Sequence, residues 1–343
     1  MRVRNLLKRL AILPSVAIAV VMVACGTILE DNSDCTLVCH IKFKYDMNMK
    51  FADAFANSVD YVTLCVYDAE SGKLVERVVD SGEALAQEGY VMTLDDLKPG
   101  TYDLVAWCGD GLMNNNFMVP QPTVGVSHIS ELNCTMAREE NNTVKEDVGQ
   151  LFHGMKRVTI EGEYGVRKET ISLTKDTNVV RVILQHLSGI DVDKDLFRFE
   201  ITDKNGALKY DNTLLSNEEI TYYPWSVTSG TAGIGNGEIS DATRAQTSVS
   251  VALAEFTVNR LLMENNPILS VYNNTNDKLV LSIPLKDYAL LVKGYYNRNM
   301  EDQEYLDRQD EYNLTFFLDE FGDWAAGVVI INSWSVVIND TEL

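Results

Sequence analysis

The sequence predicts an all-β protein made of two tandem antiparallel β-sandwich domains that follow an N-terminal signal peptide. The first observation is that short runs of alternating apolar and polar residues recur along the chain, separated by turn-forming residues. The second is that almost no segment has a strong helical pattern, and this combination is typical of β-sandwiches. The third is length, because the roughly 319 residues that follow the signal peptide exceed one ordinary core and suit two domains.

The chain begins with a basic segment, an apolar stretch and a cysteine, which is the arrangement of a secretory signal. Residues 10–24 are apolar, but they are fewer than the roughly 20 that a spanning helix needs, and Pro14 interrupts them. The motif Met22-Val23-Ala24-Cys25-Gly26 resembles a bacterial lipobox, with Met22 at the position usual for leucine. The resemblance implies that residues 1–24 are a lipoprotein signal peptide and that Cys25 is lipidated. An ordinary signal peptide that contains a cysteine is the alternative.

Residues 25–35 are expected to form a lipidated tether. They contain Glu30, Asp31 and Asp34 and have no strong periodicity. Buried acyl chains contribute roughly 0.8 kcal/mol per CH₂ group, so lipid on Cys25 would hold the protein on a membrane without a spanning helix. Acidic residues close behind the lipidated cysteine also occur in Bacteroidetes lipoproteins that are exported to the cell surface. We therefore expect a protein that is lipid-anchored in the bacterial outer membrane and exposed at the cell surface.

The N-terminal β-sandwich is predicted over residues 36–155. In its first strand, residues 36–45, the odd positions from Leu37 to Tyr45 form one apolar face. Residues 46–57 break the alternation and suit a short helix or an ordered loop. Pro99 and Gly100 predict a type II turn in which Gly100 has a positive φ. Further strands are predicted at residues 62–67, 74–79, 101–108 and 129–136.

The C-terminal β-sandwich is predicted over residues 156–343. Residues 226–247 are rich in Ser, Thr, Gly and Ala and predict a long loop. Residues 302–310 are charged and predict a short helix. The predicted strands cover residues 156–164, 178–187, 197–202, 248–256, 268–272, 279–283, 313–318 and 328–338.

The cysteines and the net charge restrict the environment and the partners. The five cysteines after Cys25 are Cys35, Cys39, Cys65, Cys108 and Cys134. In an oxidising compartment at least one disulfide is expected, but the alternation also turns Cys39, Cys108 and Cys134 inward as small buried hydrophobes, so both interpretations stay open.

Residues 1–24 carry four positive charges and no negative one, so the net charge falls from −21 to about −25 on their removal. Such a surface repels nucleic acid, and no nucleic-acid partner is expected.

No residue pattern predicts a catalytic, metal or cofactor site. The four histidines are scattered, and neither an H-E-x-x-H pair nor a G-x-S-x-G turn occurs. Residues 191–195 are similar to the start of a calcium loop, but Leu196 and Thr202 stand where that loop needs Gly and Glu. We therefore expect a protein that is not an enzyme, with no metal, no cofactor and no small-molecule substrate.

Several segments, in their order along the chain, resemble the type V fimbrial anchor lipoproteins of the Bacteroidales. They are residues 43–55, 62–67, 97–107, 178–189, 302–318 and 331–334. The resemblance implies two transthyretin-like β-sandwiches and a structural role at the base of a fimbria, or pilus. There the protein would fix fimbrillin-like shaft subunits to the outer membrane and limit the length of the fimbria. It also implies assembly by strand complementation, in which a strand from one subunit completes a sheet of the next.

One difference from shaft subunits bears on that role. Shaft subunits resembling this family are opened by cleavage after an arginine near the start of the mature chain, which removes the first strand. Here no arginine lies between Arg9 and Arg77, although Lys42, Lys44 and Lys50 leave a lysine-specific protease open. We therefore hypothesise that the first strand stays in place, closes one polymerisation surface and makes the protein a terminator.

The region rich in Val, Ile and Trp near the C-terminus is the first candidate for the contact with the shaft. The candidate residues are Val328, Ile330, Asn332, Trp334 and Val336, and the alternative is an ordinary core strand. Residues 226–247 are a second candidate. Another class of function, a glycan- or adhesin-type binding lipoprotein, needs an aromatic platform, and only Tyr222, Tyr223 and Trp225 cluster in an expected loop.

Overall fold

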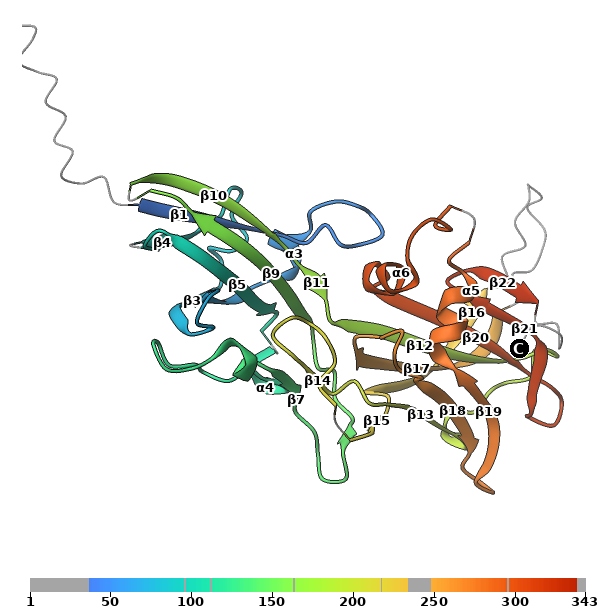
Figure 1. Cartoon of the computed structure of the whole chain (residues 1–343). Helices are drawn as coiled ribbons and strands as arrows, with labels where there is room; N and C mark the ends of the chain where they lie inside the picture. Colours follow the sequence, from blue (N-terminus) through green and yellow to red (C-terminus); the bar gives the residue numbers. More distant parts are fainter. Residues whose placement is uncertain are drawn as a thin grey trace, which may run out of the picture.

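The computed structural model describes residues 37–337, apart from residues 96, 112, 163, 217, 234–247 and 295. The signal peptide, the tether and Cys25 lie outside this range. Within it the chain is an all-β protein with a few short helices, as the sequence predicts. Figure 1 shows a half rich in blue and green strands joined by β11 and β12 to a half rich in yellow, orange and red strands.

The first half contains two sheets that face each other across a core. Among the described residues, the smaller sheet has the order β10 (Gly165–Ser172), β1 (Leu37–Lys44) and β4 (Met92–Asp95). The larger has the order β11 (Thr174–Lys175), β9 (Leu151–Ile160), β5 (Gly100–Gly109), β2 (Tyr61–Asp68) and β3 (Leu74–Ser81). The helix α3 (Phe55–Ser58) closes one end of this core through the buried Phe55.

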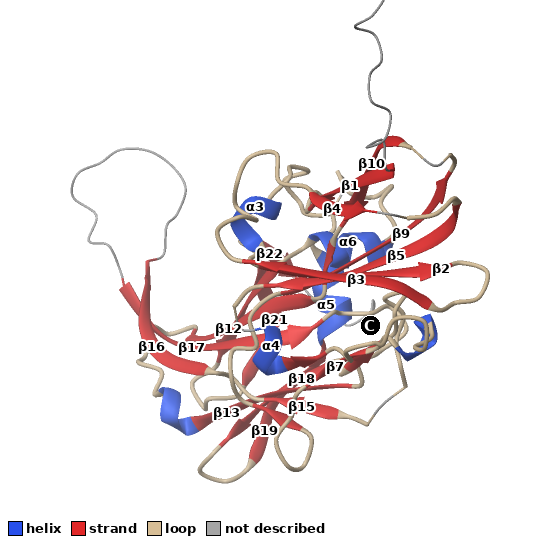
Figure 2. Ribbon diagram, turned by 90° about the vertical axis from the view of Figure 1, so that its left-hand side faces the viewer, coloured by secondary structure: helices blue, strands red, loops and turns tan. Residues whose placement is uncertain are grey.

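In the smaller sheet, buried side chains alternate along the strand as the sequence predicts, whereas the larger sheet is buried on both faces. In β1 the side chains of Leu37, Cys39, Ile41 and Phe43 are buried and the residues between them are not. In β5, Leu104 and Ala106 face the core shared with β1, whereas Val105 and Trp107 face a second core. Figure 2 shows β1, β4 and β10 above the layer with β2 and β3, and β7 below it. The larger sheet is therefore the middle one of three layers.

The second half contains a further pair of sheets. Among the described residues, one has the order β16 (Ser226–Gly233), β17 (Ser248–Asn259), β12 (Thr177–His186), β20 (Glu311–Leu318), β21 (Trp324–Ile331) and β22 (Trp334–Val337). The other has the order β19 (Lys278–Pro284), β18 (Ile268–Asn273), β13 (Phe197–Asp203), β15 (Ile220–Tyr222) and β8 (Thr143–Val144). The helices α5 (Leu285–Leu291) and α6 (Asp302–Arg308) lie beside these sheets and bury Tyr288 and Tyr305.

The two halves exchange strands around the predicted boundary between residues 155 and 156. That boundary lies inside β9, which pairs with β5 over ten residues, and β10 pairs with β1. The chain finally passes from the sheets of the first half to those of the second between β11 and β12. In the other direction, β7 (Cys134–Met136) pairs with β14 (Ala207–Leu208), next to β6 (Phe117–Met118), and β8 pairs with β15. One apolar cluster accordingly includes Trp107 and Cys134 together with Val182 and Phe256.

Pairings that are remote in sequence account for other differences from the prediction. Among the described strands three pairs are parallel, β1 with β10, β12 with β20 and β15 with β8, so the sheets are mixed and not purely antiparallel. Residues 226–233 form the strand β16 and not a loop, because each of them pairs with β17. Gly100 has no positive φ and instead begins β5, paired with Ile160. Residues 129–131 form a 3-10 helix in place of the start of a strand.

The cysteines of the described range are free thiols. Cys39, Cys65, Cys108 and Cys134 are all buried and unpaired, which excludes a disulfide among these four. Burial raises the pKa of Cys65 to about 12, so this thiol stays protonated and behaves as a small hydrophobe. Cys35 lies outside the described residues.

Candidate functional site

The C-terminal candidate segment forms a β-hairpin at the edge of the large sheet of the second half. Residues 328–338 are predicted to form strand structure, and in the described range they comprise the end of β21, a two-residue turn and β22. Asn332 and Ser333 both have positive φ, 46° and 72°, as tight hairpin turns of the primed types require. Among the described residues β22 pairs only with β21. Within the described part of the chain, the backbone N–H and C=O groups on its other side face no partner strand.

The five candidate residues of this hairpin do not share one face, because the turn inverts the parity between the two strands. Val328 and Ile330 are half-buried on the outer face of β21, whereas the residues next to them, Val329 and Ile331, are buried. Val336 lies opposite Val329 and packs against the core. The structure therefore separates Val328 and Ile330 from Val336.

The other two candidates lie at the turn. Asn332 fixes its start, since its Oδ1 accepts a hydrogen bond from the backbone N–H of Asn313 at 2.7 Å. Trp334 begins β22, and 66 % of its surface is exposed. An exposed tryptophan beside an unpaired strand edge offers a partner both backbone pairing and an apolar contact.

The first strand, β1, is the central strand of its sheet. It pairs with β10 along eight residues and with β4 along four. Its buried side chains form the middle of the first core together with Leu64, Leu104 and Phe152. Loss of this strand would open a long apolar groove between β4 and β10.

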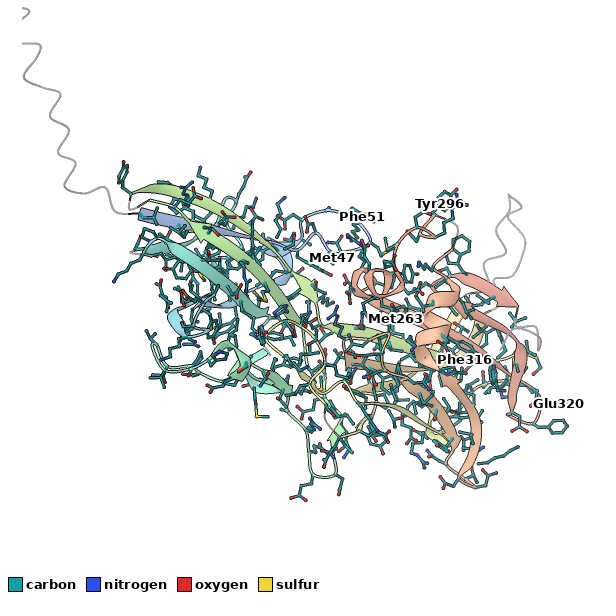
Figure 3. All side chains as sticks on the ribbon, in the orientation of Figure 1. Met47, Phe51, Met263, Tyr296, Phe316 and Glu320 are labelled. Atoms are coloured by element: carbon teal, nitrogen blue, oxygen red, sulfur yellow. The ribbon has the colours of Figure 1, made fainter. Side chains whose placement is uncertain are left out.

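A cleft lined by both polar and apolar groups lies between the two halves beside β1. Its volume is about 690 Å³, and it lies between the loop that follows β1 and the junction of α6 with β20. Tyr45 donates a hydrogen bond from its hydroxyl to Asp310 Oδ1. Arg308 donates to the carbonyl of Asp46 at 3.1 Å, and its guanidinium lies over the Phe51 ring, 4.6 Å from the centroid. Figure 3 shows Met47 and Phe51 on the loop that reaches toward α6.

Two charged residues of this cleft, Arg308 and Asp310, make contacts that join the two halves. Burial and the neighbouring Asp310 raise the pKa of Tyr45 well above its ordinary value, so its hydroxyl remains a donor. These contacts join residues more than 250 positions apart in the sequence. No spacing motif signals them, and sequence reasoning missed Tyr45, Arg308 and Asp310 for that reason.

A second polar joint lies deeper, where β11 leads into β12. Arg260 donates to both carboxylate oxygens of Asp307 at 2.7 Å and to the carbonyl of Asn212 at 2.8 Å. Asp176 is fully buried and accepts a hydrogen bond from the Asn212 side chain at 2.9 Å. Burial raises the pKa of Asp176 to about 7, against the opposing effect of Arg260, whose Nε lies 3.8 Å away.

Tyr222, Tyr223 and Trp225 do not form the aromatic platform that the alternative glycan-binding function would need. Tyr222 is buried in β15 and donates its hydroxyl hydrogen bond to Asn205 at 2.6 Å. Tyr223 is half-buried, and Trp225 is exposed over only 38 % of its surface. The three rings therefore do not present one flat surface to solvent.

Neither a metal-binding cluster nor a membrane-spanning helix occurs in the described ranges. No group of three or more His, Cys, Asp or Glu side chains in these ranges is placed to hold a metal ion. No helix within them has the length and apolar character needed to cross a bilayer.

Comparison with known families gives one match over most of the chain. The model of the fimbrillin-A associated anchor proteins Mfa1 and Mfa2 matches residues 32–340. A search of curated proteins gave no match.

Solved structures extend this comparison. A crystal structure of a protein from Bacteroides thetaiotaomicron, described as an adhesin, has 34 % sequence identity and a TM-score of 0.78, over 89 % of this chain and 99 % of that chain. Another from the same species, described as polysaccharide-binding, has 31 % identity and a TM-score of 0.75, over 90 % and 99 %. The fimbrial anchor protein Mfa2 from Porphyromonas gingivalis shares the fold, with 15 % identity and a TM-score of 0.66, over 89 % and 100 %.

Proposed function

The chain belongs to the family of fimbrillin-A associated anchor proteins, and from that membership we propose that it fixes the base of a fimbria to the bacterial outer membrane. Membership gives it a structural role in fimbriae and a place at the cell envelope. The proposal adds that lipid on Cys25 supplies the membrane attachment. It also adds that the protein ends the polymer and so limits fimbrial length.

The position of β1 supports the role of terminator. In this protein β1 lies between β10 and β4 and buries Leu37, Cys39, Ile41 and Phe43. With β1 in place, the groove that an incoming strand would fill is already occupied. The absence of arginine between Arg9 and Arg77 means that an arginine-specific protease has no site at which to remove this strand alone.

The edge strand β22 supports a contact by strand complementation. Its outer side has unpaired backbone groups among the described residues, and a partner strand added there would satisfy them. Trp334 would cover an apolar side chain of that strand. In this arrangement a shaft subunit extends the sheet of the anchor, and the lipid holds the assembly on the cell.

Deletion of the gene tests the proposed function. If the protein is the anchor, the mutant should release fimbriae into the medium, and these should be longer than those of the parent strain in electron micrographs. Fimbriae that stay attached to the cells at unchanged length would contradict the proposal.

A single substitution tests the contact at β22. We expect Trp334→Ser to weaken the retention of fimbriae on the cell while the protein keeps its thermal stability, because this side chain is mostly exposed. Tyr296→Ser removes another large aromatic side chain that is 95 % exposed elsewhere, and it should have no effect. If both variants retained fimbriae on the cell equally well, β22 would not be the contact with the shaft.

Glycan capture is a second candidate function, favoured by the relative of 31 % identity described as polysaccharide-binding. The cleft beside Arg308 is where we would place a sugar. Specific binding of the isolated protein to a glycan array would favour this function, and fimbriae that remain attached after gene deletion would do so as well.

A further inference from the structure

Three turns meet at the end of the second half that lies far from β1. The first, residues 187–196, follows β12, and the second, residues 319–323, joins β20 to β21. The N–H of Leu187 donates to the carbonyl of Leu318 at 3.0 Å, which holds these two turns side by side. The third turn, between β18 and β19, is joined by the N–H of Asn274, which donates to the carbonyl of Leu196 at 2.8 Å.

This end exposes large apolar side chains. Leu187 is 64 % exposed, Ile190 54 % and Phe321 80 %. We call these three residues the distal patch. In Figure 3 the neighbouring Glu320 lies at the far right of the molecule, whereas β1 begins at the far left of Figure 1. Large apolar side chains that gather at one exposed place indicate a contact surface more often than an isolated exposed side chain does.

The turn that contains Phe321 is ordered. Asp319 Oδ1 accepts hydrogen bonds from the N–H groups of Phe321 and Asp323, both at 2.9 Å, and Gly322 adopts a positive φ of 79°. The aromatic ring is thus held out on a fixed backbone, so little backbone entropy would be lost on binding. An apolar contact that is ordered before binding is suited to a docking surface.

Carboxylates surround the distal patch. The three turns carry Asp191, Asp193, Asp195, Asp277, Asp319, Glu320 and Asp323, and the cations in or beside them are Lys194, Arg198 and Lys278. Lys194 pairs with Asp195, Arg198 with Asp277 and Lys278 with Asp323. Among the described residues Asp191, Asp193 and Glu320 have no salt bridge. The rim of the patch is therefore negative.

We propose that the distal patch docks a fimbrial shaft subunit through a face with an apolar pocket rimmed by lysine or arginine. The proposal rests on the proposed function and adds a second contact to the one at β22. The negative rim favours a partner whose docking face is basic. A second copy of this chain would place carboxylates against carboxylates, and an anionic membrane surface would meet the same repulsion.

The distal patch and the hairpin turn of β22 lie at opposite ends of one sheet. Ile331, just before that turn, pairs with Leu314 near the start of β20, whereas Phe321 follows the end of β20. Substitutions at the two places can therefore be separated. A shaft subunit that contacts both would lie along the sheet edge.

The test uses the full-length lipoprotein in detergent and purified shaft subunits from fimbriae of the same strain, with binding measured by surface plasmon resonance. The combined variant Leu187→Ser, Ile190→Ser, Phe321→Ser should bind at least about tenfold more weakly, as expected when several apolar contacts are lost from the centre of an interface. The control is Tyr164→Ser with Val166→Ser, which removes side chains of 74 % and 59 % exposure near the start of β1 and should leave binding unchanged.

The charge of the rim gives an independent readout. Glu320→Lys should slow association severalfold at low salt and have little effect at high salt, because added salt screens the attraction between exposed charges. Thermal unfolding of each variant should match that of the wild type, since the substituted side chains are exposed.

The outcomes separate this proposal from the proposed function. If the wild-type protein binds shaft subunits and the triple variant binds equally well, the distal patch is not the docking surface and the anchor role still stands. If the triple substitution abolishes self-association of the protein and leaves binding to shaft subunits intact, the occupant is a second copy and the proposal is overturned. If the wild-type protein does not bind shaft subunits at all, the proposed function fails together with it.

Discussion

Two buried tyrosines show how a single hydroxyl contributes to the joint between the halves. Tyr45 donates to Asp310 across the cleft, whereas the hydroxyl of Tyr312 has no hydrogen-bond partner among the described residues. We expect Tyr45→Phe to lower the free energy of unfolding by about 1–2 kcal/mol, because a hydrogen bond to a carboxylate is lost. Tyr312→Phe should change it by less than about 0.5 kcal/mol or raise it, since only an unpaired polar atom is removed. Urea denaturation of both variants measures the difference, and equal losses would contradict this role for Tyr45.

Asp176 makes the stability depend on pH. Its pKa of about 7 in the folded protein is higher than the ordinary value of 3.8, because burial disfavours the charged form. The folded state therefore holds a proton that the unfolded state has lost. The resulting stabilisation is complete below about pH 4 and is lost as the pH rises through 7.

His153 acts in the opposite direction at lower pH. Burial lowers its pKa to about 4 from 6.5, so its contribution is complete above pH 6.5 and is lost as the pH falls toward 4. The effect of Asp176 on the unfolding free energy is therefore best measured between pH 6.5 and 8, where the contribution of His153 is nearly constant.

We expect the wild type to lose on the order of 1 kcal/mol of unfolding free energy over that pH interval through Asp176, and Asp176→Asn to lose correspondingly less. Urea denaturation at the two ends of the interval measures this change. A variant with the same pH dependence as the wild type would show that Asp176 does not titrate there.

At the level of strands, close approach explains a glycine in β9. A Cβ atom on Gly154 would lie 2.5 Å from Ile171 Cγ2 and 2.9 Å from the carbonyl oxygen of Ser172. We expect Gly154→Ala to destabilise the protein by about 1–3 kcal/mol, because backbone and core side chains would have to shift. Gly327→Ala, in β21, is the matched control, since a Cβ atom there would meet no packed neighbour within 4 Å and the φ of Gly327 is not positive. Thermal unfolding compares the two, and a neutral Gly154→Ala would show that β9 and β10 can separate without cost.

Strands with a clear alternation of apolar and polar residues could be predicted from the sequence. Strands that form because a neighbouring strand pairs with them could not. In β1 the buried faces of Leu37, Cys39, Ile41 and Phe43 follow directly from the period of two. In β16, residues such as Ser229 and Gly230 have little intrinsic preference for strands, and pairing with Ala252 and Val251 of β17 provides it. Local sequence has no information on such a partner.

The same limit applies to the candidate site. The composition near Val328 and Trp334 indicates strand structure, and the structure has strands there. The division of the five candidate residues between two faces depends on the turn at Asn332 and Ser333. This turn lies within an apolar run that predicts one continuous strand, so the sequence pattern does not indicate it. The contacts of Tyr45 and Arg308 across the cleft join remote parts of the chain, so no local pattern indicates them.

At the level of the whole molecule, the exchange of strands makes the two halves one mechanical unit. β7 and β8 pair with strands of the second half, and Arg260 joins Asp307 to the loop at Asn212. A force applied between β1 and the distal patch would load this joint and not a flexible linker. That is the property an anchor needs, because it transmits tension from a fimbria to its membrane attachment.

The proposed anchor function depends on attachment of the protein to the outer membrane through lipid on Cys25, and substitution of that residue removes the attachment point. In cells that carry Cys25→Ser in place of the wild-type gene, the protein should appear in the culture medium together with fimbriae, because no acyl chain holds it on the outer membrane. Fractionation and immunoblotting of cells and medium give the result. Retention of both the protein and the fimbriae on the cell envelope, as in the wild type, would show that lipid on Cys25 is not what anchors them.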